Sequence, residues 1–154
     1  MTDKPHIMIV EARFYEDIAD ELAKGAIAEL EKARATYDRV SVPGAFEIPA
    51  AIRMAVRSMD FATGHKRYDG YVALGCVIRG ETSHYDYVCG ESARKLQDLA
   101  CDHTLALGYG ILTCENSDQA WERASVDKKN KGGDVARACL SMLEIKRRFH
   151  LFPR

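Results

Sequence analysis

The stretch Asp69–Glu91, which reads DGYVALGCVIRGETSHYDYVCGE, decides the fold. Its first half, Gly70–Ile78, is an almost unbroken apolar run with glycines at its borders. A run of this length that is rich in Val and Ile predicts a strand buried on both faces, as in a parallel sheet. Gly80 ends the strand, and Thr82 or Ser83 can cap a helix that follows. The stretch therefore predicts a buried strand, a glycine turn and the start of a helix.

The junction between this strand and the helix is a candidate anion site. Backbone N–H groups and the positive end of a helix dipole bind anions such as phosphate. His84 falls in the first helical turn, where an imidazole can exchange protons near neutral pH. The same residues are also compatible with a plain turn and a surface histidine. The spacing Gly75-x-x-x-x-Gly80 resembles half of a P-loop, but Glu81 stands where that motif needs Lys, so we reject a nucleotide triphosphatase.

Length and composition restrict the class of protein. The 154 residues predict one domain, spanning 1–154, and the 47% hydrophobic and 29% charged residues are typical of a soluble globular protein. A net charge of −1 gives no electrostatic reason to bind nucleic acid or an anionic membrane. We expect no signal peptide. The five cysteines form no C-x-x-C pair, which favours reduced thiols in a cytoplasmic protein and argues against a disulfide scaffold or a zinc site.

Strand and helix patterns alternate along the rest of the chain. The remaining strands are expected at His6–Glu11, Tyr37–Val42 and Gly110–Thr113. Helices are expected from about Tyr15, from Pro49 to about Met59, from His84 to about Leu105, after a cap at Asn116 or Ser117, and from about Asp134 to Phe149. The inward-facing residues are expected to be Ile18, Leu22, Ala26 and Leu30, then Val88, Ser92, Leu96 and Leu99, and last Val135, Cys139, Met142 and Leu143. This alternation predicts a three-layer α/β/α sandwich on a four-stranded, mainly parallel sheet.

Candidate binding residues follow the predicted strands. Ligands of such folds bind at the carboxyl ends of the strands. There, Phe14 and Phe46 are candidates for stacking on a ring, and Glu47 for binding hydroxyls. Arg123 and Lys131 are candidates for binding an anion or a carbonyl. The alternatives are aromatic packing on the rim of the core, a carboxylate that complements a helix dipole, and solvated basic side chains.

Five segments, spread in order over nearly the whole chain, resemble the lumazine synthase family. They are EARFYED (11–17), VPGAFEIPAA (42–51), YDGYVALGCVIRGETSHYDYV (68–88), YGILTCENSDQAWERA (109–124) and NKGGDVA (130–136). The resemblance implies a flavodoxin-like fold and a transferase in the penultimate step of riboflavin biosynthesis. That step condenses 5-amino-6-(D-ribitylamino)uracil with 3,4-dihydroxy-2-butanone 4-phosphate to give 6,7-dimethyl-8-ribityllumazine. It implies no metal and no organic cofactor.

The resemblance also implies a role for each matched site residue. For the pyrimidine substrate, Phe14 would stack on the ring, Lys131 would reach a ring carbonyl, and the backbone of Cys76, Val77 and Ile78 would contact the ring. Ala45, Phe46 and Glu47 would hold the ring and the ribityl chain. For the phosphorylated substrate, Glu81 and Thr82 would bind the phosphate, Arg123 would pair with it, and His84 would transfer protons.

The family further implies a homopentamer with active sites between subunits and a functional link to riboflavin synthase. Tyr109 stands where an aromatic residue of the neighbouring subunit, usually Phe, closes the site. The chain begins close to its first strand and lacks the longer N-terminal arm of some shell-forming members. We therefore expect a free pentamer rather than an icosahedral shell.

Two other functions compete with the synthase. A module that binds a flavin or pteridine-like ligand would keep Phe14 and Phe46 but would not need His84 and Arg123 together. A flavodoxin-like electron carrier would need a Ser/Thr-rich phosphate loop after the first strand, where this chain has Glu11-Ala12-Arg13-Phe14.

Overall fold

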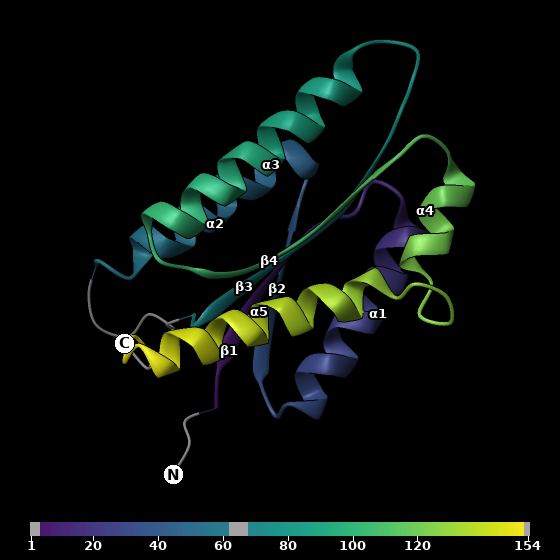
Figure 1. Cartoon of the computed structure of the whole chain (residues 1–154). Helices are drawn as coiled ribbons and strands as arrows, with labels where there is room; N and C mark the ends of the chain where they lie inside the picture. The colour runs from purple at the N-terminus through teal and green to yellow at the C-terminus, as the bar shows by residue number, and fades with distance from the viewer. Residues whose placement is uncertain (1–3, 62–67, 153–154) are drawn as a thin grey trace.

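A sheet of four parallel strands forms the centre of the structure, a computed structural model that describes residues 4–61 and 68–152 (Figure 1). The strands lie in the order β2-β1-β3-β4. Their bounds are β1 His6–Ala12, β2 Thr36–Val42, β3 Gly70–Ile78 and β4 Ala106–Cys114. The helices are α1 Glu16–Lys32, η1 Ala45–Glu47, α2 Ile48–Ser58, α3 His84–Asp102, α4 Ser117–Ala124 and α5 Lys131–Arg148. The predicted α/β architecture with a parallel sheet is confirmed.

Strand β3 has the predicted bounds and lies inside the sheet. Its residues from Gly70 to Gly75 are buried, whereas the last three, Cys76, Val77 and Ile78, are half-buried. A strand can be this apolar only if both faces of the sheet are covered. The partly open end of β3 is the end where the loop to α3 begins.

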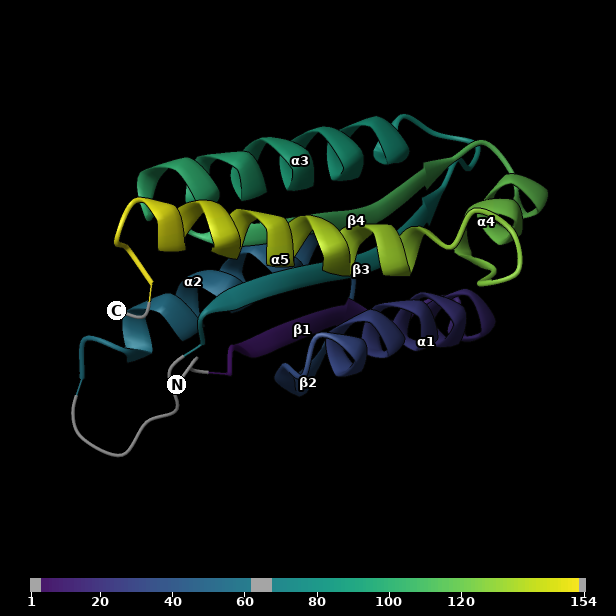
Figure 2. The ribbon, with the colours of Figure 1, turned by 60° about the horizontal axis from the view of Figure 1, so that its bottom comes forward.

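Two hydrophobic clusters separate the sheet from its two helical layers. Residues of α1, α4 and α5 pack with one face of the sheet, and residues of α2 and α3 pack with the other. Figure 2 shows the same division, with α5 and α1 on one side and α3 and α2 on the other. The three predicted helix faces are buried as expected, except for Met142, which is 42% exposed because it lies just off the stripe formed by Cys139 and Leu143.

Strand β4 is longer than the predicted Gly110–Thr113, because Gly108 and Gly110 conceal its first half in the sequence. A Cβ atom on Gly108 would stand 2.3 Å from the Val135 carbonyl oxygen, and one on Gly110 would stand 2.8 Å from the Ala73 carbonyl oxygen. These glycines therefore let α5 and β3 approach the strand closely, and they do not interrupt it.

Two helix ends also differ from the prediction. Helix α3 ends at Asp102 rather than near Leu105, since Thr104 adopts a left-handed conformation with φ of 56°. Helix α5 begins at Lys131 rather than near Asp134, because the Asn130 side chain caps it by accepting a hydrogen bond from the Gly133 N–H at 3.3 Å. The pair Gly132-Gly133 reads as a loop in the sequence but forms the first turn of the helix.

Other local predictions have mixed outcomes. Asn116 caps α4 as predicted, accepting from the Gln119 N–H at 2.9 Å, and Pro49 lies in the first turn of α2. Ser83 occupies the N-cap position of α3 without a capping hydrogen bond from its side chain, whereas the Thr82 hydroxyl accepts from the His84 N–H at 3.3 Å. The polar composition of Phe61–Arg67 also predicts a loop, and most of this segment falls outside the described residues. No helix in the described part of the chain is long and apolar enough to cross a membrane.

We predict that Gly132→Ala destabilises the fold by about 1–3 kcal/mol, the usual cost of overpacking. A Cβ atom there would stand 2.0 Å from the Leu22 carbonyl oxygen, so α5 must move away from α1. Urea denaturation at one protein concentration measures the change. The matched control is Gly90→Ala in α3, where no atom lies within 4 Å of the added carbon. That control should keep or raise the stability, because Ala favours a helix. Equal losses in both variants would contradict the packing argument.

Candidate active site

The carboxyl ends of the four strands carry most of the predicted site residues. Phe14 follows β1, the η1 turn with Ala45, Phe46 and Glu47 follows β2, and Glu81, Thr82 and His84 follow β3. Helix α4, with Arg123, follows β4 and lies beside α1 at this edge (Figure 2). The parallel topology thus brings segments that are distant in sequence to one end of the sheet.

The turn between β3 and α3 presents free backbone donors. The N–H groups of Gly80, Glu81 and Thr82 have no hydrogen-bond partner among the residues that the structure describes. Nothing lies within 4 Å of the place where Gly80 would carry a Cβ atom, so the turn faces open space. The side chain of His84 is exposed in the first turn of α3. Unpaired donors and a helix start make this turn suitable for an anion.

Electrostatic interactions link Tyr15, the neighbour of Phe14, with Arg123 through two cysteines. The Phe14 ring meets the Tyr15 ring edge-on at 4.9 Å between centroids. Burial raises the pKa of the Tyr15 hydroxyl, and the nearby Cys76 adds to the shift. The Cys76 thiol is in hydrogen-bond contact with the Cys114 thiol on the neighbouring strand. Burial raises the pKa of Cys114 and the nearby charge of Arg123 partly offsets the shift. Tyr15, in the aromatic turn, and Arg123 therefore both lie near the two cysteines.

The Cys76 thiol is poorly suited to be a nucleophile. Burial is the main cause that raises its pKa to about 12, and Cys114 and Cys89 add to the shift. Because the thiolate is the reactive form of cysteine, this side chain remains a protonated thiol at neutral pH. The structure thus fits a backbone role for Cys76 rather than a covalent one.

Arg123 differs from the other arginines at this edge. Arg13, Arg39 and Arg79 each pair with carboxylates. The guanidinium of Arg123 donates through Nη1 to the Gln119 carbonyl oxygen at 3.1 Å and has no carboxylate partner within the described ranges 4–61 and 68–152. A guanidinium has five N–H donors, so most of those on Arg123 remain available for a ligand.

Lys131 is half-buried and begins α5 at the α1 side of the sheet. Its Nζ atom lies 3.5 Å from the Asp134 carboxylate, one helical turn further on. An exposed pair at this separation is weak, so the ammonium group can exchange Asp134 for a ligand carbonyl.

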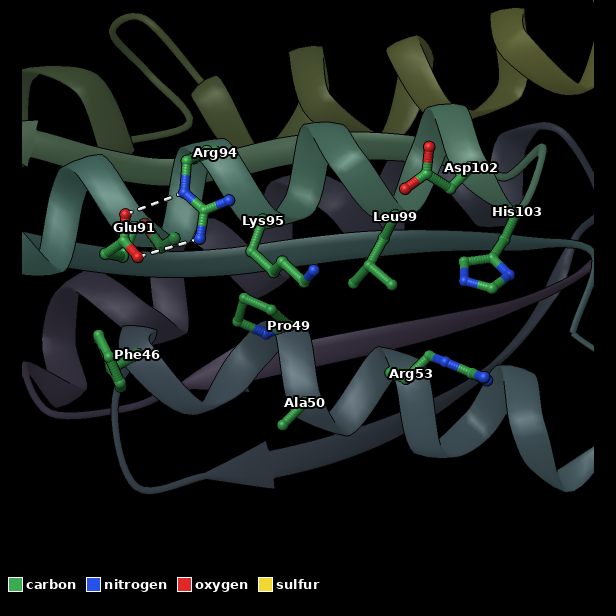
Figure 3. A pocket seen from close by; sticks show the side chains of 11 residues that line it. Phe46, Pro49, Ala50, Arg53, Glu91, Arg94, Lys95, Leu99, Asp102 and His103 are labelled. Atoms are coloured by element: carbon green, nitrogen blue, oxygen red, sulfur yellow. Dashed lines mark hydrogen bonds and ion pairs between the residues drawn. The ribbon is translucent and has the colours of Figure 1, made fainter.

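Phe46 and Tyr109 lie apart from this group, on the α2–α3 side of the sheet. Phe46 lies at one end of a pocket of about 450 Å³ between α2 and α3 (Figure 3). Tyr109, on β4, is in hydrogen-bond contact with Ser92 of α3, and burial raises the pKa of its hydroxyl. Among the predicted site residues only Phe46 lines this pocket. One chain therefore does not bring Tyr109 to the turn between β3 and α3.

The structure shows ion pairs at the strand ends that were not predicted from the sequence. Glu11 is buried at the end of β1 and binds Arg13 and Arg39. Arg79 joins the turn after β3 to the turn after β4 by donating to Glu115 at 2.9 Å, and it also stacks over Tyr85 at 4.3 Å. The one signal in the sequence was a glutamate at the end of the apolar run HIMIVE. No group of His, Cys, Asp and Glu in the described part is arranged to hold a metal ion.

Comparison with known proteins identifies the family. The family model described as 6,7-dimethyl-8-ribityllumazine synthase matches residues 4–147. A relative from Rhizobium meliloti (strain 1021), named 6,7-dimethyl-8-ribityllumazine synthase 1, is 59% identical over 93% of this chain and 92% of its own length. Relatives from Bartonella tribocorum and Agrobacterium fabrum, both named 6,7-dimethyl-8-ribityllumazine synthase, are each 57% identical, over 97% and 94% of this chain and 95% and 97% of their own lengths. The chain therefore belongs to the 6,7-dimethyl-8-ribityllumazine synthase family, the transferases that form this intermediate of riboflavin biosynthesis.

Proposed function

We propose that the chain condenses 5-amino-6-(D-ribitylamino)uracil with 3,4-dihydroxy-2-butanone 4-phosphate at the edge of the sheet where Arg123 and the turn after β3 lie. The main observation in support is that Arg123 keeps free N–H donors, whereas Arg13, Arg39 and Arg79 are paired with carboxylates. A phosphate that Arg123 binds can also accept from the unpaired N–H groups of Glu81 and Thr82. The open face of Gly80 leaves room for it.

The pyrimidine is assigned to the other part of the same edge. Phe14 offers an exposed ring for stacking, and Lys131 is the cation assigned to a ring carbonyl. The half-buried end of β3 at Cys76, Val77 and Ile78 offers backbone groups to the ring. Ala45, Phe46 and Glu47 follow β2, where the Glu47 carboxylate can accept from ribityl hydroxyls.

The reaction needs proton transfers more than it needs covalent help from the protein. The amine of the pyrimidine attacks the ketone of the phosphorylated substrate, and loss of water gives an imine. A proton then leaves carbon while the C–O bond to phosphate breaks, and Arg123 with the start of α3 stabilises the charge on the departing phosphate. His84 is positioned to take and return these protons. Ring closure by the second amine and loss of a further water complete the lumazine.

We further propose a homopentamer in which Tyr109 of one subunit closes the site of its neighbour. The support is that Tyr109 lies on the α2–α3 face of the sheet, away from the phosphate turn of its own chain. A cytoplasmic location and a link to riboflavin synthase, which consumes the lumazine, belong to the same proposal. The five free cysteines fit a reducing compartment.

We predict different kinetic defects for Arg123→Ala and His84→Ala, followed through the lumazine chromophore. Loss of Arg123 removes charged hydrogen bonds to the phosphate, so KM for the phosphorylated substrate should rise about 10- to 100-fold. Loss of His84 should lower kcat by about a hundredfold at most, because holding the two reactive substrates together supplies much of the rate.

Arg148→Ala, an exposed arginine at the far end of α5, is the control and should leave both constants unchanged. Complete loss of turnover in folded His84→Ala would contradict the proximity argument. If the folded wild-type protein binds the pyrimidine but does not accelerate lumazine formation, the chain is a binding module and the proposed function is wrong.

Cys76→Ala should retain kcat within about threefold, because a thiol whose pKa lies at about 12 takes no part as a thiolate at neutral pH. Steady-state assays at pH 7 measure this effect. A loss of more than about a hundredfold, with urea stability unchanged, would instead assign covalent or acid–base chemistry to the thiol.

Mixing two variants tests the shared site. Refolding Tyr109→Ala with Arg123→Ala in equal amounts should recover activity above that of either variant alone. Some sites then combine an unaltered Tyr109 from one subunit with an unaltered Arg123 from its neighbour. Phe14→Ala mixed with Arg123→Ala should recover no activity, since one subunit supplies both residues to a given site. Recovery in both mixtures or in neither would contradict the assignment, and light scattering that gives the mass of an icosahedral shell would contradict the free pentamer.

A further inference from the structure

The turn that carries Phe14 is not fixed by packing of the Phe14 ring. This side chain is 75% exposed, and its one ring contact in the described part of the chain is the edge-on contact with Tyr15. A ring with so little buried area gains little from the hydrophobic effect, so packing alone does not fix its position. Other contacts must set the course of the backbone between β1 and α1.

A buried carboxylate lies directly below this turn. Glu11, on β1, is 3% exposed and points to the α1 side of the sheet. Arg39 of β2 donates to both of its oxygens, from Nε to Oε2 at 2.7 Å and from Nη2 to Oε1 at 2.9 Å. Arg13 donates from Nη1 to Oε1 at 2.8 Å. Three charge-assisted hydrogen bonds satisfy the buried charge and fix the directions of both arginines.

Arg13 also reaches across the turn. Its Nη2 atom donates to the Asp20 carboxylate in the second turn of α1. One guanidinium thus connects the end of β1 with α1, while the residues between them include Phe14. The hydrogen bond to Asp20 is the largest effect that raises the pKa of Arg13 above its ordinary value, so the Arg13 guanidinium remains protonated.

We propose that Arg13 is a positioning residue. Together with Glu11, Arg39 and Asp20 it forms a clamp that orders the turn of Phe14 for stacking on the pyrimidine. The inference rests on the proposed function, which assigns that stacking to Phe14. A turn whose backbone is already ordered loses less conformational entropy when the ligand binds, so the clamp raises affinity without touching the ligand. The two ion pairs of Arg13 differ in strength, because Glu11 is buried whereas Asp20 is exposed.

A double-variant cycle tests the proposal. Binding of the ribityl-pyrimidine is measured by fluorescence titration, and KM and kcat are measured in the lumazine assay. Arg13→Ala should weaken binding about tenfold and raise KM for the pyrimidine, with kcat within about twofold. Glu11 keeps both hydrogen bonds from Arg39 in this variant, so no buried charge is left bare. Asp20→Asn, which removes the negative charge of the exposed ion pair but keeps an oxygen that can accept from Arg13, should weaken binding about two- to threefold.

The decisive result is the combination with Phe14→Ala. If Arg13 acts through Phe14, the double variant Arg13→Ala/Phe14→Ala binds no more weakly than Phe14→Ala alone. A full additional loss would mean that Arg13 acts on the ligand or on the whole fold, and would overturn the positioning role. Arg148→Ala, at an exposed arginine at the end of α5, should leave binding unchanged. Unchanged urea stability of Arg13→Ala relative to this control would exclude a general loss of structure.

The outcomes also separate this inference from the proposed function. If Phe14→Ala binds the pyrimidine as tightly as wild type, the stacking role is wrong and the clamp has nothing to position. If Phe14→Ala weakens binding while Arg13→Ala and Asp20→Asn do not, the stacking role survives and the clamp alone is overturned. Partial recovery by Arg13→Lys, which keeps the charge but loses the planar fork, would support the clamp.

Discussion

Coverage of both faces of β3 is the constraint on which the architecture depends. A strand whose first six residues are all buried needs helices above and below the sheet. Parallel strands can meet this need only when a helix crosses over between successive strands, so all the turns that leave the strands lie at one edge. The candidate site therefore draws on segments that follow four different strands, and each segment supplies only one or a few of its candidate side chains.

Close approach of backbones supplies the second requirement. Glycines at 108, 110 and 132 remove side chains where α5 meets β4 and α1, and a Cβ atom at any of them would come within 3 Å of a backbone oxygen. With these contacts, Lys131 begins α5 directly beside α1, the helix that follows Phe14. The packing of α5 against α1 and the placement of Lys131 therefore both depend on Gly132.

The parts of the fold that could be predicted from the sequence are those with a local signal. Apolar periodicity was sufficient for the buried faces of α1 and α3 and for β3, and the cap at Asn116 was sufficient for α4. The start of α5 and the first half of β4 could not be predicted, because a glycine that permits close packing looks like a glycine that permits a turn. The candidate site residues came from motifs, which predict residues but not their partners. The ion pair between Glu11 and Arg39 depends on the β1–β2 register, which sets Arg39 opposite Ile9, two residues before Glu11 on the same face, and no local pattern contains that information.

The charges at the strand ends divide into two groups with different tasks. Arg13, Arg39 and Arg79 are bound to carboxylates and connect neighbouring segments, so their charges are already compensated. Within residues 4–61 and 68–152, Arg123 is held only by a backbone carbonyl, which fixes its direction without neutralising it. Among the described residues, Arg123 is therefore an uncompensated guanidinium at the edge of the sheet where the turn after β3 also leaves backbone N–H groups unpaired. In a chain with a net charge of −1, a local charge of this kind, rather than a diffuse basic surface, is what can attract an anion to one place.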